Sequence, residues 1–356
     1  MTLNLLILEG DGIGPEIAAA TRLVLNAADT RFGLGLTFSE APIGFTALAQ
    51  SGTTFPDSTW AACQAADGIV LGPVSHNDYP PKAQGGLNPS GELRIRLDLF
   101  ANIRPARTHA GVPAPSRHDF DLVIVRENTE GFYADRSMFL GPGEFMPTAD
   151  VALATRKVTR QASLRIAEQG FQLAMQRRRK VTAVHKANVM RVSDGLFLDC
   201  MRQVRARHPE VEYEEQLVDA MAALLVRDAS KFDVIVATNM FGDILSDEAA
   251  ELAGGLGLAA SLNAGTDHAV AQAQHGSAPS IAGRDLANPS SLIVSAAMLL
   301  AWLGERRQTQ ALLDAARAIE AAVESAIASP ETRTSDLGGS LGTADFARLI
   351  AAKIAA

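Results

Sequence analysis

Short apolar runs alternate with longer amphipathic stretches along the chain. The apolar runs are rich in aliphatic and β-branched residues, a composition typical of buried strands. These predicted strands lie at Leu3–Leu8, Gly68–Leu71, 122–125, 181–184 and 234–236. Helical periodicity predicts helices at 15–28, 150–178, 193–207, 217–229, 243–253, 290–304 and 308–327. The alternation predicts an α/β fold in which helices cover both faces of a sheet.

Two aspartates follow the predicted strand at 234–236. Asp243 and Asp247 are four residues apart in the next helical stretch, so their carboxylates project from the same helix face. Oxygen ligands of this kind bind a hard cation such as Mg²⁺ or Mn²⁺. The helix dipole alone also favours acidic residues in a first helical turn, so the spacing leaves both interpretations open. Asp219, after the stretch 211–218, is a third candidate ligand.

Basic residues supply the second set of candidates. Arg94 and Arg104 lie in one segment, and Arg126 follows a predicted strand. Guanidinium groups bind carboxylates bidentately, so a cluster of three would suit a di- or tricarboxylate, although most arginines are solvated surface groups. Lys186 directly follows the predicted strand at 181–184 and is a candidate base if burial and nearby cations lower its pKa.

A glycine-rich turn follows the first predicted strand. Its glycines at 10–14 have the spacing G-x-G-x-G, whereas the dinucleotide-binding motif is G-x-G-x-x-G. Pro15 also removes a backbone N–H that a phosphate would use. The segment therefore predicts a tight functional turn rather than a Rossmann phosphate loop.

Composition narrows the class of protein. The chain has 356 residues, of which 47% are hydrophobic, and a formal net charge of −8. The negative charge argues against a nucleic-acid partner or an anionic membrane surface. The two cysteines form neither a zinc pattern nor a disulfide framework. With no signal-peptide pattern and no apolar run of about 20 residues, the expected location is the cytoplasm.

Six sequence blocks occur together and in order along nearly the whole chain. They are GDGIGPEI, LDLFANIRP, RENTEGFYA, VHKANVMRVSDGLF, ATNMFGDILSDEAAELAGGLGLAAS and HGSAPSIAG. Together they resemble the β-decarboxylating dehydrogenase family, which contains isocitrate, isopropylmalate, homoisocitrate and tartrate/D-malate dehydrogenases. The resemblance implies a non-Rossmann fold of two α/β domains that share a large mixed sheet. It places 1–100 with 256–356 in a cofactor-side domain, and 101–255 in a dimerisation and substrate domain with an arm near 132–150.

The resemblance also assigns roles to individual residues. It implies that Ser90, Arg94, Arg104 and Arg126 bind the substrate. Asp243 and Asp247 would bind Mg²⁺ or Mn²⁺ together with Asp219 of the partner chain in a homodimer with shared active sites. Tyr133, Lys186 and Asp219 would carry out the proton transfers, the last two from the partner. The residues expected to contact the cofactor are Asn188, His275, Gly276, Ser277, Ala278, Ser280, Ile281 and Asn288.

Three departures from the family pattern bear on specificity. The segment 87–92, LNPSGE, lacks the leucines that precede the first arginine in isopropylmalate enzymes, which favours a polar 3-substituent. Ser280 replaces the aspartate of NAD-type members, but no Lys-Tyr pair of the NADP type is present and Ile281 is retained, which favours NAD. Gln272 replaces a family glutamate.

The predicted function is NAD-dependent, metal-dependent oxidative decarboxylation of a 3-substituted (R)-malate-type acid. The favoured small-molecule substrate is isocitrate- or homoisocitrate-like. 3-Isopropylmalate and tartrate/D-malate remain alternatives. A non-catalytic regulatory subunit would be expected to lack some of the implied catalytic residues, and all of them are present.

Overall fold

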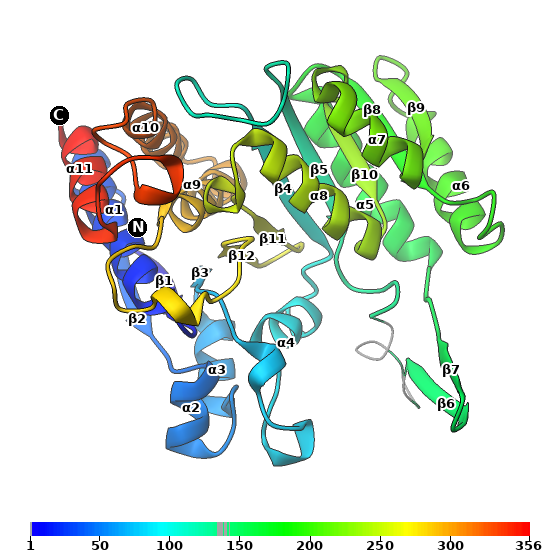
Figure 1. Cartoon of the computed structure of the whole chain (residues 1–356), viewed down its shortest axis with the longest axis horizontal. Helices are drawn as coiled ribbons and strands as arrows, with labels where there is room; N and C mark the ends of the chain where they lie inside the picture. Colours follow the sequence, from blue (N-terminus) through cyan, green and yellow to red (C-terminus); the bar gives the residue numbers. More distant parts are fainter. Residues whose placement is uncertain (1, 134–137, 139–140, 142) are drawn as a thin grey trace.

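The computed structural model describes residues 2–133, 138, 141 and 143–356. Ten of the described strands form one mixed sheet in the order β2-β1-β3-β12-β11-β4-β5-β10-β8-β9, and two more form a separate pair (Figure 1). The strands are β1 (Leu3–Leu8), β2 (Leu36–Glu40), β3 (Gly68–Leu71), β4 (Ala101–Arg107), β5 (Asp121–Glu127), β6 (Glu144–Thr148), β7 (Val151–Ala154), β8 (Lys180–His185), β9 (Glu212–Leu217), β10 (Val234–Ala237), β11 (Leu262–Ala264) and β12 (Ala269–Gln272).

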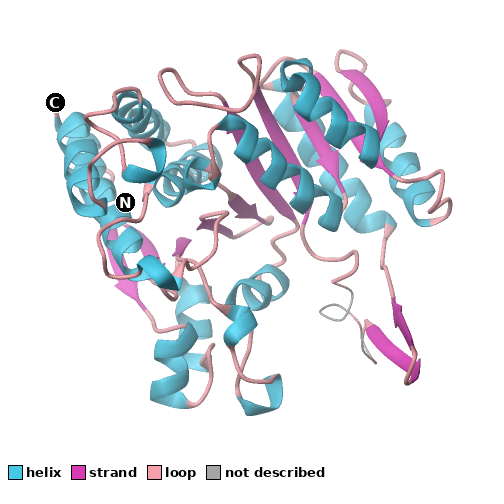
Figure 2. Ribbon diagram, in the orientation of Figure 1, coloured by secondary structure: helices cyan, strands magenta, loops and turns pink. Residues whose placement is uncertain are grey.

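The sheet consists of two parallel blocks joined by an antiparallel centre. Strands β2, β1, β3 and β12 are parallel to one another, and so are β5, β10, β8 and β9. Between the blocks, β11 is antiparallel to both β12 and β4, and β4 is antiparallel to β5. The sheet therefore has a left and a right half that meet at β11 and β4, as Figure 2 shows.

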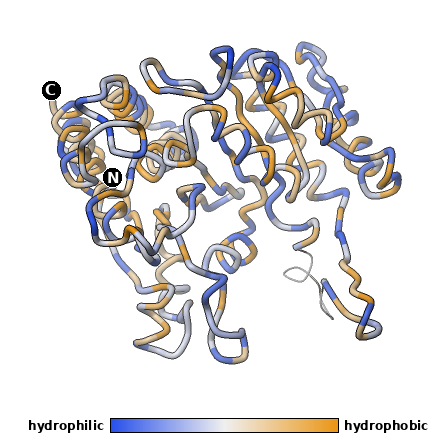
Figure 3. The backbone as a smooth tube through the Cα atoms, viewed as in Figure 1, coloured by the Kyte–Doolittle hydropathy of each residue, from blue (hydrophilic) through white to orange (hydrophobic). Residues whose placement is uncertain are grey.

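Helices cover both faces of each block, as parallel strands require (Figure 2). The described α-helices are α1 (Gly14–Phe32), α2 (Gly44–Ser51), α3 (Asp57–Ala65), α4 (Pro89–Arg96), α5 (Arg160–Met175), α6 (Ser193–Arg205), α7 (Val218–Asp228), α8 (Asn239–Ala253), α9 (Ser290–Arg307), α10 (Gln310–Ile327) and α11 (Thr343–Ala355). Figure 3 shows hydrophobic residues along the central strands and hydrophilic ones in many of the outer loops.

Strand alternation divides the core into four clusters. In β1, Leu5 and Ile7 pack with α1, α9, α10 and α11, whereas Leu6 and Leu8 pack on the opposite face with α3 and α4. In the other block, Ile235 and Ala237 of β10 pack with α7 and α8. Val234 and Val236 pack on the opposite face with α5 and α6. Two clusters thus belong mainly to the terminal thirds of the chain and two to its middle. We therefore keep the division into 1–100 plus 256–356 and 101–255 as a proposal.

Two predicted helices differ from the structure at their N-terminal ends. The predicted helix at 150–178 is wrong over its first residues, because Val151–Ala154 form β7 and α5 begins only after Thr159, whose hydroxyl accepts the Ala162 N–H at 3.2 Å. The predicted helix at 243–253 begins earlier, at Asn239, and is continuous to Ala253. Asp243 therefore lies past the first helical turn, where the helix dipole explains it less well.

Five strands of the ten-stranded sheet were not predicted, namely β2, β4, β9, β11 and β12. Two of them show why. The edge strand β9, EYEEQL, is mostly polar and has no apolar run. Strand β4, ANIRPAR, contains Pro105 and two arginines, although it lies at the centre of the sheet. Pro105 is tolerated because β11 pairs with β4 only at Ala101–Ile103, so the missing N–H costs no ladder bond on that side.

The predicted arm near 132–150 lies partly outside the described residues. The part that the structure describes forms the antiparallel pair β6–β7, which projects away from the rest of the protein in Figure 1. Every residue of both strands is exposed. None of the helices in the described ranges is long and apolar enough to cross a membrane.

Candidate active site

Side chains from both halves of the sheet line a cavity of about 230 Å³. Arg104 comes from β4, Arg126 from the carboxyl end of β5, and Asp243 from α8. Ends of parallel strands are where open α/β sheets place their binding sites. The other predicted residues on the cavity wall are Ser90, Arg94, Tyr133, His275 and Gly276. Substrate, proton-transfer and cofactor candidates from distant parts of the sequence therefore meet in one place.

Asp243 binds two of the arginines. Arg126 Nη1 donates a hydrogen bond to Asp243 Oδ1, and Arg104 Nη1 lies 3.1 Å from the same oxygen. The arginine side chains are only 3% and 7% exposed. Burial, followed by repulsion from Arg126, lowers the pKa of Arg104 to about 10. Arg104 therefore remains charged at neutral pH, and the two guanidiniums share one carboxylate, so the cavity wall suits anionic groups of a ligand.

Helix α8 fixes the position of this cluster. Asn239 Oδ1 accepts hydrogen bonds from Arg126 Nε at 3.1 Å and from Nη2 at 2.6 Å. Ser246 Oγ accepts one from Arg104 Nη1 at 2.7 Å. At position 242 a Cβ atom would lie 2.7 Å from the Arg126 Cβ, so glycine is required there for the close approach of α8 to β5. Asn239 and Ser246 were not predicted as site residues; the only sequence signal is their helical spacing around Asp243.

The carboxylates of Asp243 and Asp247 fit a hard divalent cation. Asp247 Oδ1 accepts a hydrogen bond from Gln274 Nε2 at 2.7 Å, and neither Oδ2 atom accepts one from the described residues. Both side chains are partly exposed. Among residues 2–133, 138, 141 and 143–356, no group of three or more His, Cys, Asp or Glu is placed to hold a metal ion. A cation here would take further oxygen ligands from water, substrate or a second chain.

A chain of side-chain amides ends at the cavity. Asn128 Nδ2 donates to the Leu99 carbonyl at 2.9 Å and to Asn263 Oδ1 at 2.9 Å. Asn263 Nδ2 in turn donates to Gln272 Oε1 at 3.2 Å, and Ser90 Oγ donates to the same oxygen at 3.0 Å. Because a backbone carbonyl can only accept, it sets the orientation of each amide after it. The consequence is that the Gln272 Nε2 donor is left for a ligand in the cavity.

Tyr133 and Arg94 complete the wall. The Arg126 guanidinium carbon lies 5.9 Å from the centre of the Tyr133 ring, which places the phenol beside the arginine cluster. Arg94 is half-buried on α4, about one helical turn after Ser90. The structure thus brings together all four predicted substrate-binding residues.

Lys186, Asp219 and Asn188 do not line this cavity. Lys186 Nζ donates to Asp219 Oδ1 at 2.5 Å, and this hydrogen bond lowers the pKa of the Asp219 carboxyl. The Asp219 side chain is 64% exposed and Asn188 is exposed. The three residues lie together at the surface, after β8 and at the start of α7. Within one chain, the predicted base is therefore separate from the predicted substrate site.

The predicted cofactor loop 275–288 runs from the cavity wall toward the α9 end of the fold. His275 Nδ1 lies 2.9 Å from the Gly276 carbonyl oxygen, its Nε2 is buried without a hydrogen-bond partner among the described residues, and burial lowers its pKa. Asn288 is buried and donates to Asp336 Oδ2 at 3.0 Å. Gly276, Ala278 and Ser280 are exposed, whereas Ile281 packs on the core.

The glycine-rich turn at 10–14 supports this loop. The Ile13 N–H donates to the Ser277 carbonyl at 2.9 Å, and a Cβ at position 12 would lie 2.0 Å from that oxygen. Ser277 Oγ also lies 2.7 Å from Ser75 Oγ. Asp11 accepts the N–H groups of Phe45 at 2.8 Å and of Ser75 at 2.9 Å. The turn is therefore a packing element under the predicted cofactor loop, a role that sequence spacing did not reveal.

Comparison with known proteins agrees with this architecture. The family model described as "Isocitrate/isopropylmalate dehydrogenase" matches residues 4–350. The chain belongs to this family. It is accordingly an oxidoreductase that acts by oxidative decarboxylation of a small-molecule substrate, and the predicted family, enzyme class and fold are confirmed.

Named relatives within the isocitrate/isopropylmalate dehydrogenase family differ in substrate. The chain is 40% identical over 349 residues to the 3-isopropylmalate dehydrogenase of Archaeoglobus fulgidus, covering 98% of both chains. It is 41% identical over 352 residues to the isocitrate/homoisocitrate dehydrogenase of Thermus thermophilus, again covering 98% of both. A solved isocitrate dehydrogenase from Methylococcus capsulatus superimposes with a TM-score of 0.88 at 38% identity and covers 100% of both chains. Overall identity therefore does not select the substrate.

Proposed function

We propose that this chain catalyses NAD-dependent, Mg²⁺- or Mn²⁺-dependent oxidative decarboxylation of a 3-substituted (R)-malate-type acid with a polar, isocitrate- or homoisocitrate-like substituent. The observation that carries the proposal is the convergence of Arg94, Arg104 and Arg126 with Asp243 in one cavity. Guanidiniums that bind carboxylates, placed against carboxylates that bind a hard cation, fit a substrate that is both a polycarboxylate and a chelator.

Each group has a defined role in the proposed reaction. The three arginines bind the substrate carboxylates, and Asp243 and Asp247 hold the cation with the partner's Asp219. When bound, the cation lowers the pKa of the substrate hydroxyl and stabilises negative charge on the oxygen during loss of CO₂. The partner's Lys186, paired with the partner's Asp219, accepts the hydroxyl proton. Tyr133 donates a proton to the carbon that CO₂ leaves.

The amide chain supports a polar 3-substituent. Because Ser90 and Asn263 both donate to Gln272 Oε1, Nε2 is the donor that the Gln272 side chain retains for a ligand, and Gln272 lines the cavity together with Arg94. A carboxylate-bearing substituent would accept from this N–H, whereas an isopropyl group would leave it unpaired in a confined site. 3-Isopropylmalate and tartrate/D-malate are the alternative substrates.

NAD is the proposed hydride acceptor. Ile281 packs its side chain on the core and Ser280 is exposed, so no basic residue at these positions is available to bind a 2′-phosphate. His275, with its buried Nε2, and Asn288, held by Asp336, are positioned at the two ends of the proposed NAD loop. Between these two residues, we expect NAD to contact the backbone of Gly276, Ser277 and Ala278. The partner's Asn188 completes the proposed contacts.

A homodimer would bring the separated groups together. The surfaces around Lys186, Asp219 and Asp243 expose large apolar side chains, which are typical of interaction surfaces. These are Val189 at 70%, Val192 at 88%, Val226 at 59% and Ile244 at 56% exposure. The β6–β7 pair adds exposed apolar positions of its own, visible in orange in Figure 3. We assign both surfaces to a homodimer in which each cavity is completed by the other chain.

A steady-state panel tests the proposal. The purified chain should be assayed with isocitrate, homoisocitrate, 3-isopropylmalate, tartrate and D-malate, with NAD or NADP, and with or without Mn²⁺. We expect the highest kcat/KM for a substrate with a polar substituent, in the presence of NAD and metal. Comparable turnover of 3-isopropylmalate would contradict the substrate assignment, and turnover in the presence of a chelator would contradict the metal.

A further inference from the structure

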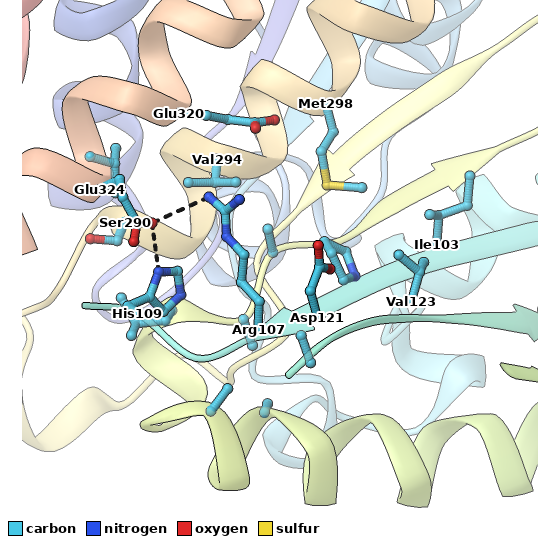
Figure 4. Close-up of a pocket in the computed structure, with 18 of the residues that line it drawn as sticks. Ile103, Arg107, His109, Asp121, Val123, Ser290, Val294, Met298, Glu320 and Glu324 are labelled. Carbon is cyan, nitrogen blue, oxygen red and sulfur yellow. Dashed lines mark hydrogen bonds and ion pairs between the residues drawn. The ribbon is translucent and has the colours of Figure 1, made fainter. Parts of the chain in front are cut away.

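A second cavity, of about 300 Å³, lies beside β4 (Figure 4). Ile103, Pro105 and Arg107 line it, and because they alternate with Arg104 along the strand they point away from the proposed substrate site. Ile103 packs against both the α1–α9–α10 cluster and the α5–α6 cluster, so the cavity lies where the two halves of the protein meet. Its apolar wall is formed mainly by Val123, Leu173, Leu258, Val294, Met298, Val323 and Ile327.

The basic groups on this wall already have acidic partners. Glu324 Oε2 lies 3.3 Å from Arg107 Nη2 and 2.7 Å from His109 Nδ1 (Figure 4). Arg177 Nη2 lies 2.8 Å from Asp121 Oδ1. An anionic ligand would have to compete with these carboxylates for the arginines, so the cavity is poorly suited to an anion.

Glu320 on α10 is the exception among the charged groups of the wall. Its carboxylate forms no hydrogen bond or ion pair with any residue in the described ranges. Burial is the main cause of its raised pKa, and the more distant charge of Arg107 only partly opposes this effect. In Figure 4 the Glu320 side chain extends from α10 toward Met298. Arg107 and His109 pair with Glu324, and Arg177 pairs with Asp121, so Glu320 is the one carboxylate of this wall without an ion-pair partner among the described residues. An unpaired carboxylate in a largely apolar cavity is stabilised by a bound cation.

We propose that this cavity binds a small organic ammonium ion whose nitrogen pairs with Glu320 and whose apolar body packs on Val294, Met298 and Val323. An ammonium group supplies the hydrogen-bond donors that the carboxylate lacks. A cavity of about 300 Å³ is within the range of small-molecule sites that combine an apolar wall with a few polar groups. The proposal is independent of the substrate assigned above, because none of these residues lines the other cavity.

Matched probes test the charge requirement. Binding of 2-phenylethylammonium and of its neutral analogue 2-phenylethanol to the full chain should be measured by isothermal titration calorimetry at neutral pH. We expect the ammonium probe to bind at least about tenfold more tightly, since a charge-assisted hydrogen bond contributes more than a neutral one. Equal affinities, or no saturable binding at millimolar concentrations of the ammonium probe, would overturn the proposal.

Variants and a wild-type measurement locate the site. Glu320→Gln preserves the shape of the side chain and should abolish the preference for the ammonium probe. Glu305→Gln, an exposed position on α9 outside the cavity, should leave the preference unchanged. In the unmodified protein, the probe should shift the methyl resonances of Val294, Met298 and Val323, a result that does not depend on variant folding. A preference retained in folded Glu320→Gln, or unshifted methyl resonances, would show that the probe does not bind here.

Discussion

The two cavities use the same strand in different ways. Arg104 on β4 belongs to a dense network in which two buried guanidiniums share Asp243, whereas its neighbours Ile103 and Pro105 face a cavity that is mostly apolar. In the first cavity, charges are held together although their burial is costly. In the second, Glu324 and Asp121 are paired with basic side chains, whereas the Glu320 carboxylate has no ion-pair partner among the described residues.

The difference shows that the protein buries like charges close together, at a cost in electrostatic free energy, in the first cavity and not in the second. Burial and, after it, repulsion from Arg126 lower the pKa of Arg104, and a ligand carboxylate or a cation bound by Asp243 would change this balance directly. Such perturbed, buried charges are characteristic of catalytic sites. The second cavity has the features of a site for binding rather than for chemistry, because its wall offers apolar contact and few polar groups.

The largest expected effect is on the shared carboxylate of the first cavity. Asp243→Asn should reduce metal-dependent turnover by more than about 100-fold, because a neutral amide is a poor ligand for a hard cation. The measurement is kcat with saturating Mn²⁺, together with circular dichroism to verify folding. Glu251→Gln, an exposed substitution on the same helix, serves as the control. Near-normal activity of folded Asp243→Asn would reject the metal assignment.

Mixed dimers test whether the first cavity needs a second chain. Lys186→Ala and Asp243→Asn should each be nearly inactive alone. In a dimer that contains one chain of each kind, one site receives both substitutions and the other neither, so activity should return. Differently tagged chains, co-expressed and purified through both tags, give the measurement. No recovery in a verified mixed dimer would argue that Lys186 and Asp243 serve the same site from one chain.

Gln272→Glu tests the amide chain with a smaller expected effect. Ser90 and Asn263 can still donate to a carboxylate at this position, but the ligand-facing N–H is replaced by negative charge. We expect kcat/KM for a substrate with a carboxylate-bearing substituent to fall by about tenfold or more relative to 3-isopropylmalate. Gln50→Glu, exposed on α2, adds the same charge elsewhere. An unchanged ratio would remove Gln272 from the specificity argument.

The smallest expected effect concerns the rim of the second cavity. The hydrogen bond with His109 lowers the pKa of Glu324 below its ordinary value of 4.5. A lowered folded-state pKa contributes stability that is present above the unfolded pKa and is lost as pH falls through the folded one. Urea unfolding should therefore show Glu324→Gln less stable than the unmodified chain at about pH 6, with the difference fading below about pH 4. Glu331→Gln is the exposed control; a difference that is constant with pH would contradict the ion pair.

The sequence predicted those parts of the fold and site that depend on local pattern. Strands such as β1 and β10 consist almost entirely of apolar residues, and they were found where expected. β9 and β4 were not, because an edge strand tolerates polar residues and Pro105 is accommodated only by the way β11 ends. The limits of α5 also depended on the β6–β7 pair before it, which local periodicity does not reveal.

By itself, the sequence determined the α/β class, the family and the identity of the charged residues, because these depend on periodicity and on ordered motifs. Only the tertiary structure decided which of those residues meet. It placed Arg104, Arg126 and Asp243 within ion-pair distance across β4, β5 and α8, and it left Lys186 with Asp219 on another surface. The same packing created the second cavity and the orientation of the Gln272 amide, since both arise from contacts between segments far apart in the chain.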